Sequence, residues 1–318
     1  MLQADAIITL DAGRYRLRAP LASSSYGVIW RASGPRAEVA LKLVNCQQMA
    51  RAEPAQRQRW IASASKEIAF LRALEPWDER HIVRLLDSGA HGALPVMALE
   101  LLDGDLGRHV ATERNAGRPI AFNQVLAWLS QVNQALAKVH QYGWRYLDLK
   151  PANLLLDARD GSVKLADFGT SRPLAERVAH AYSGSANWQA PEQFFPNPQG
   201  RFDTDARSDY FALGAMFYYL VSGGVQLRFC SDCGAAYRAF EGAGAAQLLA
   251  QHGGQVPVTL RADEAALFLH RIARQGSGGP DALALLRALL APERQQRPCH
   301  GLEISRMIGA IRAARSPT

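Results

Sequence analysis

The pattern of apolar residues changes near residue 101, and this change restricts the fold more than any other feature of the chain. Before it, short β-branched or aromatic runs separated by Ser, Gly and Pro predict strands. These runs cover residues 15–21, 26–31, 39–44, 82–86 and 95–99. One helix is expected among them, because apolar residues recur at three- or four-residue steps between Ile61 and Leu74.

Residues after position 101 have the periodicity of helices. An amphipathic helix is expected from Val125 to Val139 and should end near Gly143. A hairpin is expected around the turn Asp160-Gly161, and further helices over residues 209–222, 281–290 and 302–311. The sequence therefore predicts an α+β protein, with a small β-rich lobe joined near residues 100–104 to a larger, mostly helical lobe.

Composition excludes several classes of protein. Of the 318 residues, 48% are hydrophobic and 20% charged, so disorder along the whole chain is excluded. No apolar run reaches the roughly 18–20 residues that span a bilayer. The N-terminal stretch carries Asp5 and only a short apolar run at residues 6–10, which is not typical of a secretory signal, so a cytoplasmic location is expected.

The basic residues are scattered, although the net charge is +7. Their densest stretch, residues 51–59, falls at the start of an expected helix, where a solvated face is the simplest interpretation. We therefore expect neither a nucleic-acid nor a membrane partner, and some of the excess positive charge would serve an anionic substrate. Four cysteines are too few for a disulfide framework in a chain of this length.

Several short motifs occur in a fixed order. They are Val39-Ala40-Leu41-Lys42, Asp148-Leu149-Lys150-Pro151-Ala152-Asn153, Asp167-Phe168-Gly169 and Ala190-Pro191-Glu192. Together they resemble the motifs of the eukaryotic-like Ser/Thr protein kinase family over residues 15–312. The resemblance implies a bilobal protein-kinase fold and transfer of the ATP γ-phosphate to serine or threonine hydroxyls of a protein substrate.

The resemblance also implies an ATP site in the first part of the chain. Lys42 would meet the phosphates, and Glu67 would form an ion pair that fixes the reach of Lys42. The other ATP-binding residues expected are Ala22, Gly27, Ile29, Ala40, Glu100, Leu102 and Leu155.

The catalytic residues are expected from the same resemblance. Asp148 would orient the acceptor hydroxyl as a general base, and Lys150 would stabilise charge on the transferred phosphate. Asn153 and Asp167 carry the hard oxygen ligands that Mg²⁺ prefers. Lys150 and a hydroxyl at Ser185 resemble the serine/threonine kinases rather than the tyrosine kinases.

The loop expected to cover the phosphates departs from the family pattern. It reads Ala22-Ser23-Ser24-Ser25-Tyr26-Gly27, with one glycine where family members tend to show three. Glycine lets backbone amides approach a phosphate without a Cβ in the way, so we expect weaker ATP binding. The serine hydroxyls would donate compensating hydrogen bonds.

A second departure lies beside the catalytic aspartate. Leu147 stands where many kinases have an arginine that pairs with a phosphorylated activation segment. We therefore expect a kinase of the non-RD type, in which residues 170–189 need no phosphorylation by that route. Two scaffold roles follow from the resemblance: Asp209 would brace the catalytic loop, and Arg297 would pair with Glu192.

The segment 223–279 is longer than a minimal kinase needs, and it contains Cys230 and Cys233 in a CxxCG pattern. This pattern resembles half of a zinc knuckle, which makes the two cysteines candidate Zn²⁺ ligands. Cys299, His300 or His252 would have to complete the site, and the alternative is two reduced thiols in a loop. Cys46 is expected to be a small core residue.

The resulting domain scheme has a kinase domain at residues 15–312, divided into lobes at about 15–100 and 104–312. Residues 1–14 are an N-terminal extension, and residues 313–318 a tail. Two alternatives remain open: a pseudokinase that serves as an ATP-binding scaffold, and a small-molecule kinase of related fold. The oligomeric state is not predicted.

Overall fold

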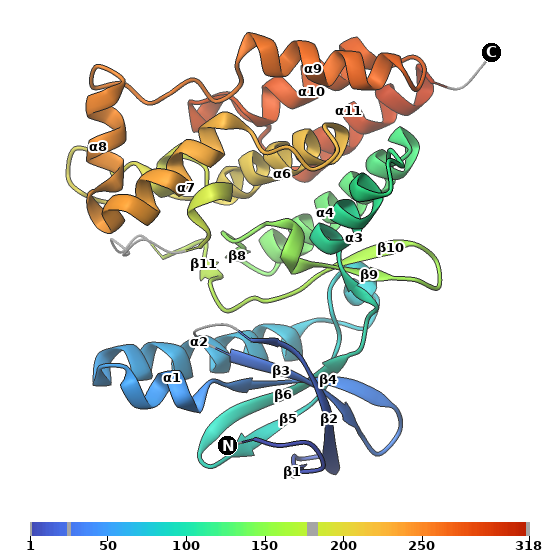
Figure 1. Ribbon diagram of the computed structural model, residues 1–318, viewed down its shortest axis with the longest axis vertical. Helices are drawn as coiled ribbons and strands as arrows, with labels where there is room; N and C mark the ends of the chain where they lie inside the picture. Colours follow the sequence, from blue (N-terminus) through green and yellow to red (C-terminus); the bar gives the residue numbers. More distant parts are fainter. Residues whose placement is uncertain (1, 24–26, 177–183, 316–318) are drawn as a thin grey trace. The chain divides into compact units, whose positions relative to one another are not determined.

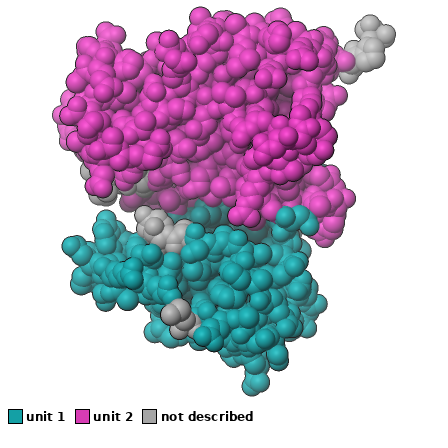
Figure 2. Space-filling model, viewed as in Figure 1, with its two compact units in different colours: residues 1–103, 166–169 teal, residues 104–165, 170–318 magenta. Residues whose placement is uncertain are grey.

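The computed structural model describes residues 2–23, 27–176 and 184–315. The chain forms two compact units (Figure 2). Unit 1 holds residues 1–103 and 166–169, and unit 2 holds residues 104–165 and 170–318. Within the described ranges, no helix is both long and apolar enough to cross a membrane.

Unit 1 is a six-stranded antiparallel sheet with the order β1-β2-β3-β4-β6-β5 (Figure 1). Its strands are β1 (Ile7–Thr9), β2 (Arg14–Ser23), β3 (Gly27–Ser33), β4 (Glu38–Val44), β5 (Leu85–His91) and β6 (Leu94–Glu100). Its helices are α1 (Cys46–Arg51), α2 (Pro54–Ala73) and η1 (Asp78–His81).

Strand β4 shows how period-two patterning places the functional side chains. Val39, Leu41 and Leu43 point into the core of unit 1, which they share with residues of β1, β2 and β6. Ala40 and Lys42 alternate with them and lie on the opposite face of the sheet. The expected helix is also present, since α2 buries Ile68 and Leu71, and Leu74 is buried just after it.

Residues between β1 and β2 join the two edges of the sheet. The Asp11 amide donates to the Ser88 carbonyl on β5 over 3.3 Å, and the Ala12 amide donates to both Asp87 carboxylate oxygens over 3.0 and 3.1 Å. The Tyr15 hydroxyl donates to Asp87 Oδ2 over 2.9 Å. Burial and the Asp87 contact raise the pKa of Tyr15 to about 12, so the phenol remains a donor.

Replacing Asp87 with alanine should therefore loosen unit 1. The change removes the acceptor for the amides of Ala12 and Ser88 and for the Tyr15 hydroxyl, so we expect a loss of about 1–3 kcal/mol in the free energy of unfolding. Tyr15→Phe removes only one of these hydrogen bonds and should have a smaller effect. Urea titration of both variants tests this order, and equal effects would contradict it.

Two expectations for unit 1 are wrong. The strand expected at residues 82–86 is shifted, because β5 begins at Leu85, while Ile82 and Val83 are fully buried before it. Cys46 is exposed at the start of α1 and is not a core residue. The sequence pattern also missed β1, whose three residues are too few to show a periodicity.

Unit 2 is mostly helical and is built around helix α6. Its helices are α3 (Leu106–Asn115), α4 (Phe122–Gln141), η2 (Pro151–Asn153), η3 (Ala186–Trp188), α5 (Pro191–Phe194), α6 (Ala206–Val221), α7 (Arg228–Phe240), η4 (Glu241–Ala243), α8 (Gly244–Gln251), α9 (Ala262–Ala273), α10 (Gly279–Leu289), η5 (Arg294–Gln296) and α11 (Gly301–Ala313). Helix α6 is buried on almost every side, which suits its apolar sequence.

Short strands flank the loops of unit 2 that contain the sequence motifs. They are β7 (Gly104–Asp105), β8 (Trp144–Arg145), β9 (Leu154–Asp157), β10 (Ser162–Leu165) and β11 (Arg172–Pro173). Strands β9 and β10 form the expected hairpin, and β8 pairs with β11. The loop between β8 and β9 holds the motif that begins at Asp148.

Candidate active site

Unit 1 contains a lysine held between two carboxylates. The Lys42 ammonium lies 2.7 and 2.9 Å from the two carboxylate oxygens of Glu67 and 2.9 Å from Asp167 Oδ1. The Glu67 side chain is 1% exposed, Lys42 17% and Asp167 50%. The ion pair expected between β4 and α2 is therefore present, and Asp167 extends it.

Electrostatics keep Lys42 charged. Burial acts to lower the pKa of Lys42, but the carboxylates of Asp167 and Glu67 outweigh burial and hold this pKa above its ordinary value. Burial also raises the pKa of Glu67, and the Lys42 ammonium opposes that shift. A charged lysine with an exposed carboxylate beside it can meet a triphosphate and its metal ion.

The strand register shows where other residues that are expected to bind ATP lie in unit 1. Ala22 pairs with Ile29, and Ile29 pairs with Lys42, so the three form one row across β2, β3 and β4. Ala40 lies two residues from Lys42 on the same face. Gly27 starts β3, whereas Ser24, Ser25 and Tyr26 lie outside the described residues.

Glu100 and Leu102 lie where unit 1 ends. The Glu100 carboxylate accepts a hydrogen bond from the Arg84 amide over 2.9 Å and lies 3.5 Å from the Arg84 side chain. This side chain therefore fixes the end of β6, and a contact between Glu100 and adenine would have to come from the backbone. Leu102 is half-buried just after the strand.

In unit 2 the residues expected to form the catalytic loop converge on one carboxylate. Lys150 Nζ lies 2.8 Å from Asp148 Oδ2 and 2.8 Å from Ser185 Oγ. The Ser185 amide donates to Asp148 Oδ1 over 2.9 Å, and Asn153 Nδ2 donates to Asp148 Oδ2 over 3.1 Å. The arrangement fixes the orientation of Asp148 and places a cation and a hydroxyl beside it.

Asp209 holds the backbone just before Asp148. Its carboxylate accepts hydrogen bonds from the Tyr146 amide over 2.8 Å and from the Leu147 amide over 2.6 Å. Leu147 has a φ of +68°, an uncommon conformation for a residue with a side chain. Asp209 also contacts His140 Nε2 over 2.8 Å. Sequence reasoning missed His140, whose only signal was its place near the end of an amphipathic helix.

A buried ion pair fixes the segment that follows Ser185. The fully buried Arg297 guanidinium forms a bidentate pair with Glu192, with N–O distances of 2.7 and 2.9 Å. Arg297 also donates to the carbonyls of Ala291, Pro292 and Arg207. The expected pairing of Arg297 with Glu192 is therefore present.

Comparison with known proteins agrees with this geometry. The sequence profile of the protein kinase domain matches residues 19–303, which is most of the chain. The chain belongs to the protein kinase family. The bilobal kinase fold expected from the sequence is thereby confirmed, with the β-rich sheet in unit 1 and the helices in unit 2.

Curated kinases from several organisms are similar to the chain. It is 31% identical over 215 residues to serine/threonine-protein kinase PknL of Mycobacterium tuberculosis, which covers 66% of this chain and 49% of the relative. It is 28% identical over 322 residues to serine/threonine-protein kinase pkn2 of Myxococcus xanthus, covering 99% of this chain and 34% of the relative. Cyclin-dependent kinase 20 of Mus musculus is 30% identical over 215 residues, covering 66% and 57%. The chain thus spans about half the length of PknL.

Asn153 and Asp167, the residues expected to bind Mg²⁺, both have side-chain oxygen atoms that could bind this ion. Asn153 uses its Nδ2 to donate to Asp148, so its amide oxygen is the atom that would bind such an ion. Asp167 is half exposed and has a φ of +61°. Both residues offer the oxygen atoms that Mg²⁺ prefers.

Leu155 is the last residue that is expected to contact adenine. It is half-buried on β9, where it pairs with Lys164 of β10.

Zinc binding by Cys230 and Cys233 is not supported. Both cysteines lie inside α7 with buried side chains, so they belong neither to a zinc knuckle nor to the loop expected as the alternative. Burial raises the pKa of both thiols, whereas a zinc ligand must be a thiolate. Throughout residues 2–23, 27–176 and 184–315, no group of three or more His, Cys, Asp or Glu side chains could hold a metal ion.

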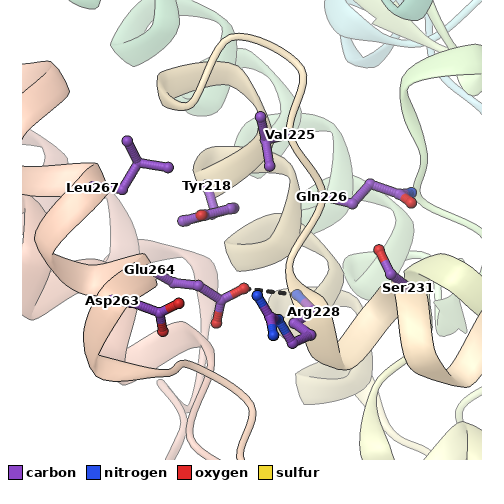
Figure 3. Close-up of a pocket in the computed structure, with 8 residues that line it drawn as sticks. All are labelled: Tyr218, Val225, Gln226, Arg228, Ser231, Asp263, Glu264 and Leu267. Atoms are coloured by element: carbon purple, nitrogen blue, oxygen red, sulfur yellow. Dashed lines mark hydrogen bonds between the residues drawn. The ribbon is translucent and has the colours of Figure 1, made fainter.

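A surface cavity of about 300 Å³ lies in unit 2 near the start of α7 (Figure 3). Helices α6, α7 and α9 and the loop before α7 line it, through Tyr218, Val225, Gln226, Arg228, Ser231, Asp263, Glu264 and Leu267. Glu264 accepts hydrogen bonds from the amides of Arg228 over 2.7 Å and Arg261 over 2.9 Å. The residues that line the cavity do not include the expected catalytic residues.

The ion pair between Lys42 and Glu67 can be tested without disturbing the shape of α2. Glu67→Gln keeps a hydrogen-bond acceptor beside Lys42 but removes the negative charge. A hydrogen bond to a charged group contributes about 1.5–3 kcal/mol, so we expect kcat/KM for ATP to fall about tenfold or more. Glu75→Gln, on an exposed residue after α2, is the control. An unchanged kcat/KM for ATP would contradict the role of the pair.

Proposed function

We propose that the chain is an ATP- and Mg²⁺-dependent protein kinase that phosphorylates serine or threonine. The contacts of Lys150 carry this proposal, since one ammonium contacts both the Asp148 carboxylate and the Ser185 hydroxyl. The names of PknL and pkn2, which describe serine/threonine kinases, support the same acceptor class. Because the chain spans about half of PknL, its activity and substrates are inferred from its own residues.

Each residue would contribute to positioning or to charge neutralisation. Asp148 would accept a hydrogen bond from the acceptor hydroxyl and hold its oxygen toward the phosphorus. Lys150 would stabilise negative charge that develops on the transferred group. Lys42 would hold the ATP phosphates, and Glu67 would keep Lys42 extended toward them. Asn153 and Asp167 would hold Mg²⁺, which neutralises charge on the phosphates.

The alternatives are less well supported. A pseudokinase would not need the Lys42–Glu67 pair and the Asp148–Lys150–Ser185 cluster together. A small-molecule kinase would not need the segment from Ser185 to Glu192, which Arg297 fixes through a buried ion pair. A protein acceptor is therefore favoured. The cytoplasmic location and the absence of nucleic-acid and membrane partners remain predictions.

Phosphate transfer from γ-labelled ATP tests the proposal. The chain is incubated with Mg²⁺, either alone, with a generic basic protein, or with a sugar or an aminoglycoside, and a parallel sample contains EDTA. We expect label on phosphoserine or phosphothreonine in the Mg²⁺ sample only. Nucleotide binding with no transfer to either protein would favour the scaffold alternative. Transfer confined to an added sugar or aminoglycoside would favour a small-molecule kinase.

A further inference from the structure

Helix α7 packs against η3 at one glycine. A Cβ atom built on Gly234 would lie 2.8 Å from the Asn187 Cβ and 3.4 Å from its Cα. The next atom, Arg238 Nη1 at 3.3 Å, is the end of a flexible side chain and can move away. The Asn187 Cβ is fixed to the backbone of η3 and cannot. Gly234 therefore permits a close approach of α7 that any larger residue would prevent.

Two further contacts hold η3 from the same part of unit 2. Gln226, in the loop before α7, donates a long hydrogen bond of 3.4 Å to the Asn187 carbonyl. The buried Trp188 ring packs edge-on against Tyr219 of α6, with the ring centroids 5.3 Å apart. Asn187 thus lies between α7 and the loop that leads into it, and a shift of α7 would carry η3 with it.

The short helix η3 begins at a residue that contacts both expected catalytic residues, Asp148 and Lys150. Ser185 is its N-cap, and the Ser185 carbonyl accepts the Trp188 amide over 2.8 Å. The same serine donates its amide to Asp148 and places its hydroxyl 2.8 Å from Lys150. Only Ala186 separates Ser185 from Asn187, so a displacement of Asn187 reaches the catalytic cluster through a short stretch of backbone.

We propose that Gly234 is a positioning residue for phosphoryl transfer: by admitting the Asn187 Cβ against α7, it sets where Ser185 meets Asp148 and Lys150. Gln226 assists through its hydrogen bond to the same residue. The link between this role and catalysis rests on the kinase activity proposed above. Packed interiors transmit such strain because they have little free volume. A misplacement of about 1 Å at a reacting group can cost about 100-fold in rate.

Gly234→Ala tests the proposal directly. We expect kcat/KM for the generic basic protein to fall about tenfold or more, with KM for ATP unchanged because the Lys42 cluster is in unit 1. Gly309→Ala is the matched control, because Gly309 also lies inside a helix but has no described atom within 4 Å of an added Cβ. That control should keep the wild-type rate.

Two double variants separate the contact from general damage to unit 2. Asn187→Gly removes the atom that an added Cβ at position 234 would meet, so Gly234→Ala with Asn187→Gly should recover much of the rate. Asn187→Ala keeps the Cβ, so Gly234→Ala with Asn187→Ala should not recover. Equal losses in both double variants, or a wild-type rate in Gly234→Ala, would overturn the proposal.

A readout that needs no activity makes the inference independent of the proposed function. Hydrogen exchange of peptides covering residues 184–190 reports the Ser185 amide, which donates to Asp148, and the Trp188 amide, which donates to Ser185. Exchange should be faster in Gly234→Ala and return toward wild type only with Asn187→Gly. An absence of phosphate transfer by the wild type would refute the kinase proposal, whereas unchanged exchange in Gly234→Ala would refute the positioning role.

Discussion

Replacing Asp148 with asparagine should lower kcat for phosphate transfer by about 10²–10⁴-fold, the usual contribution of a positioned general base. The amide keeps one oxygen that can accept the Ser185 or Lys150 hydrogen bond, so the loop should retain its shape. It cannot, however, provide the negative charge that would orient the acceptor hydroxyl and that now lies beside the Lys150 ammonium. The measurement is the initial rate of label transfer at saturating ATP.

ATP binding should survive this change, because Lys42, Glu67 and Asp167 belong to unit 1 and Asp148 to unit 2. In unit 2, Asn153 keeps its hydrogen bond to the backbone carbonyl of residue 148. The shift in melting temperature on adding nucleotide should therefore match that of the wild type. Asp160→Asn is the control, since Asp160 is an exposed residue in the turn between β9 and β10. A rate within a few-fold of wild type for Asp148→Asn would mean that Asp148 is not the base.

Replacing Arg297 with alanine should destabilise unit 2 by about 3–5 kcal/mol, the usual cost of removing one partner of a buried ion pair. The change takes the guanidinium away from the Glu192 carboxylate, which keeps its hydrogen bond from the Ser208 hydroxyl. It also removes the donor that serves the carbonyls of Ala291, Arg207 and Pro292, and the guanidinium that packs over the Phe211 ring at 5.0 Å. Denaturant unfolding followed by circular dichroism measures the loss.

Two further variants make this result specific. Arg297→Lys keeps the charge but cannot form the bidentate pair, so its stability should fall between those of the wild type and Arg297→Ala. Arg271→Ala, on an exposed residue of α9, should leave stability nearly unchanged. If Arg297→Ala were no less stable than Arg271→Ala, the ion pair would not be holding the segment around Glu192.

Local patterns in the sequence predicted the parts of the fold that depend on near neighbours in the chain. The β-branched run at residues 39–44 predicted strand β4, and the three- or four-residue steps between Ile61 and Leu74 predicted helix α2. These two elements carry Lys42 and Glu67. The resemblance to kinase motifs then pointed to the residues around Asp148, most of which lie close together in the chain. These features depend on local periodicity and short-range order, which a single sequence contains.

Features that depend on tertiary contacts could not be predicted. The spacing of Cys230 and Cys233 fits a zinc-binding CxxC pattern, but it equally fits positions i and i+3 of a helix. Only the structure shows that the two cysteines lie in helix α7. Ile82 and Val83 have the apolar, β-branched character of a strand, but they are buried just before strand β5 begins at Leu85. The contact of His140 with Asp209 and the approach of Gly234 to Asn187 join residues that are far apart in the chain, and a single sequence does not record such pairs.

The link between residues 11–12 and β5 also affects how the protein would behave in a crowded solution. An open sheet offers unpaired amide and carbonyl groups at its outer strands, and these are templates for pairing with another molecule. In unit 1 the Asp11 amide is already bonded to Ser88 and the Ala12 amide to Asp87, so part of the β5 edge is occupied from within. Loss of these hydrogen bonds would leave the Ser88 carbonyl and the Asp87 carboxylate without these partners. The residues between β1 and β2 therefore reduce the number of groups that this edge of the sheet can offer to another molecule.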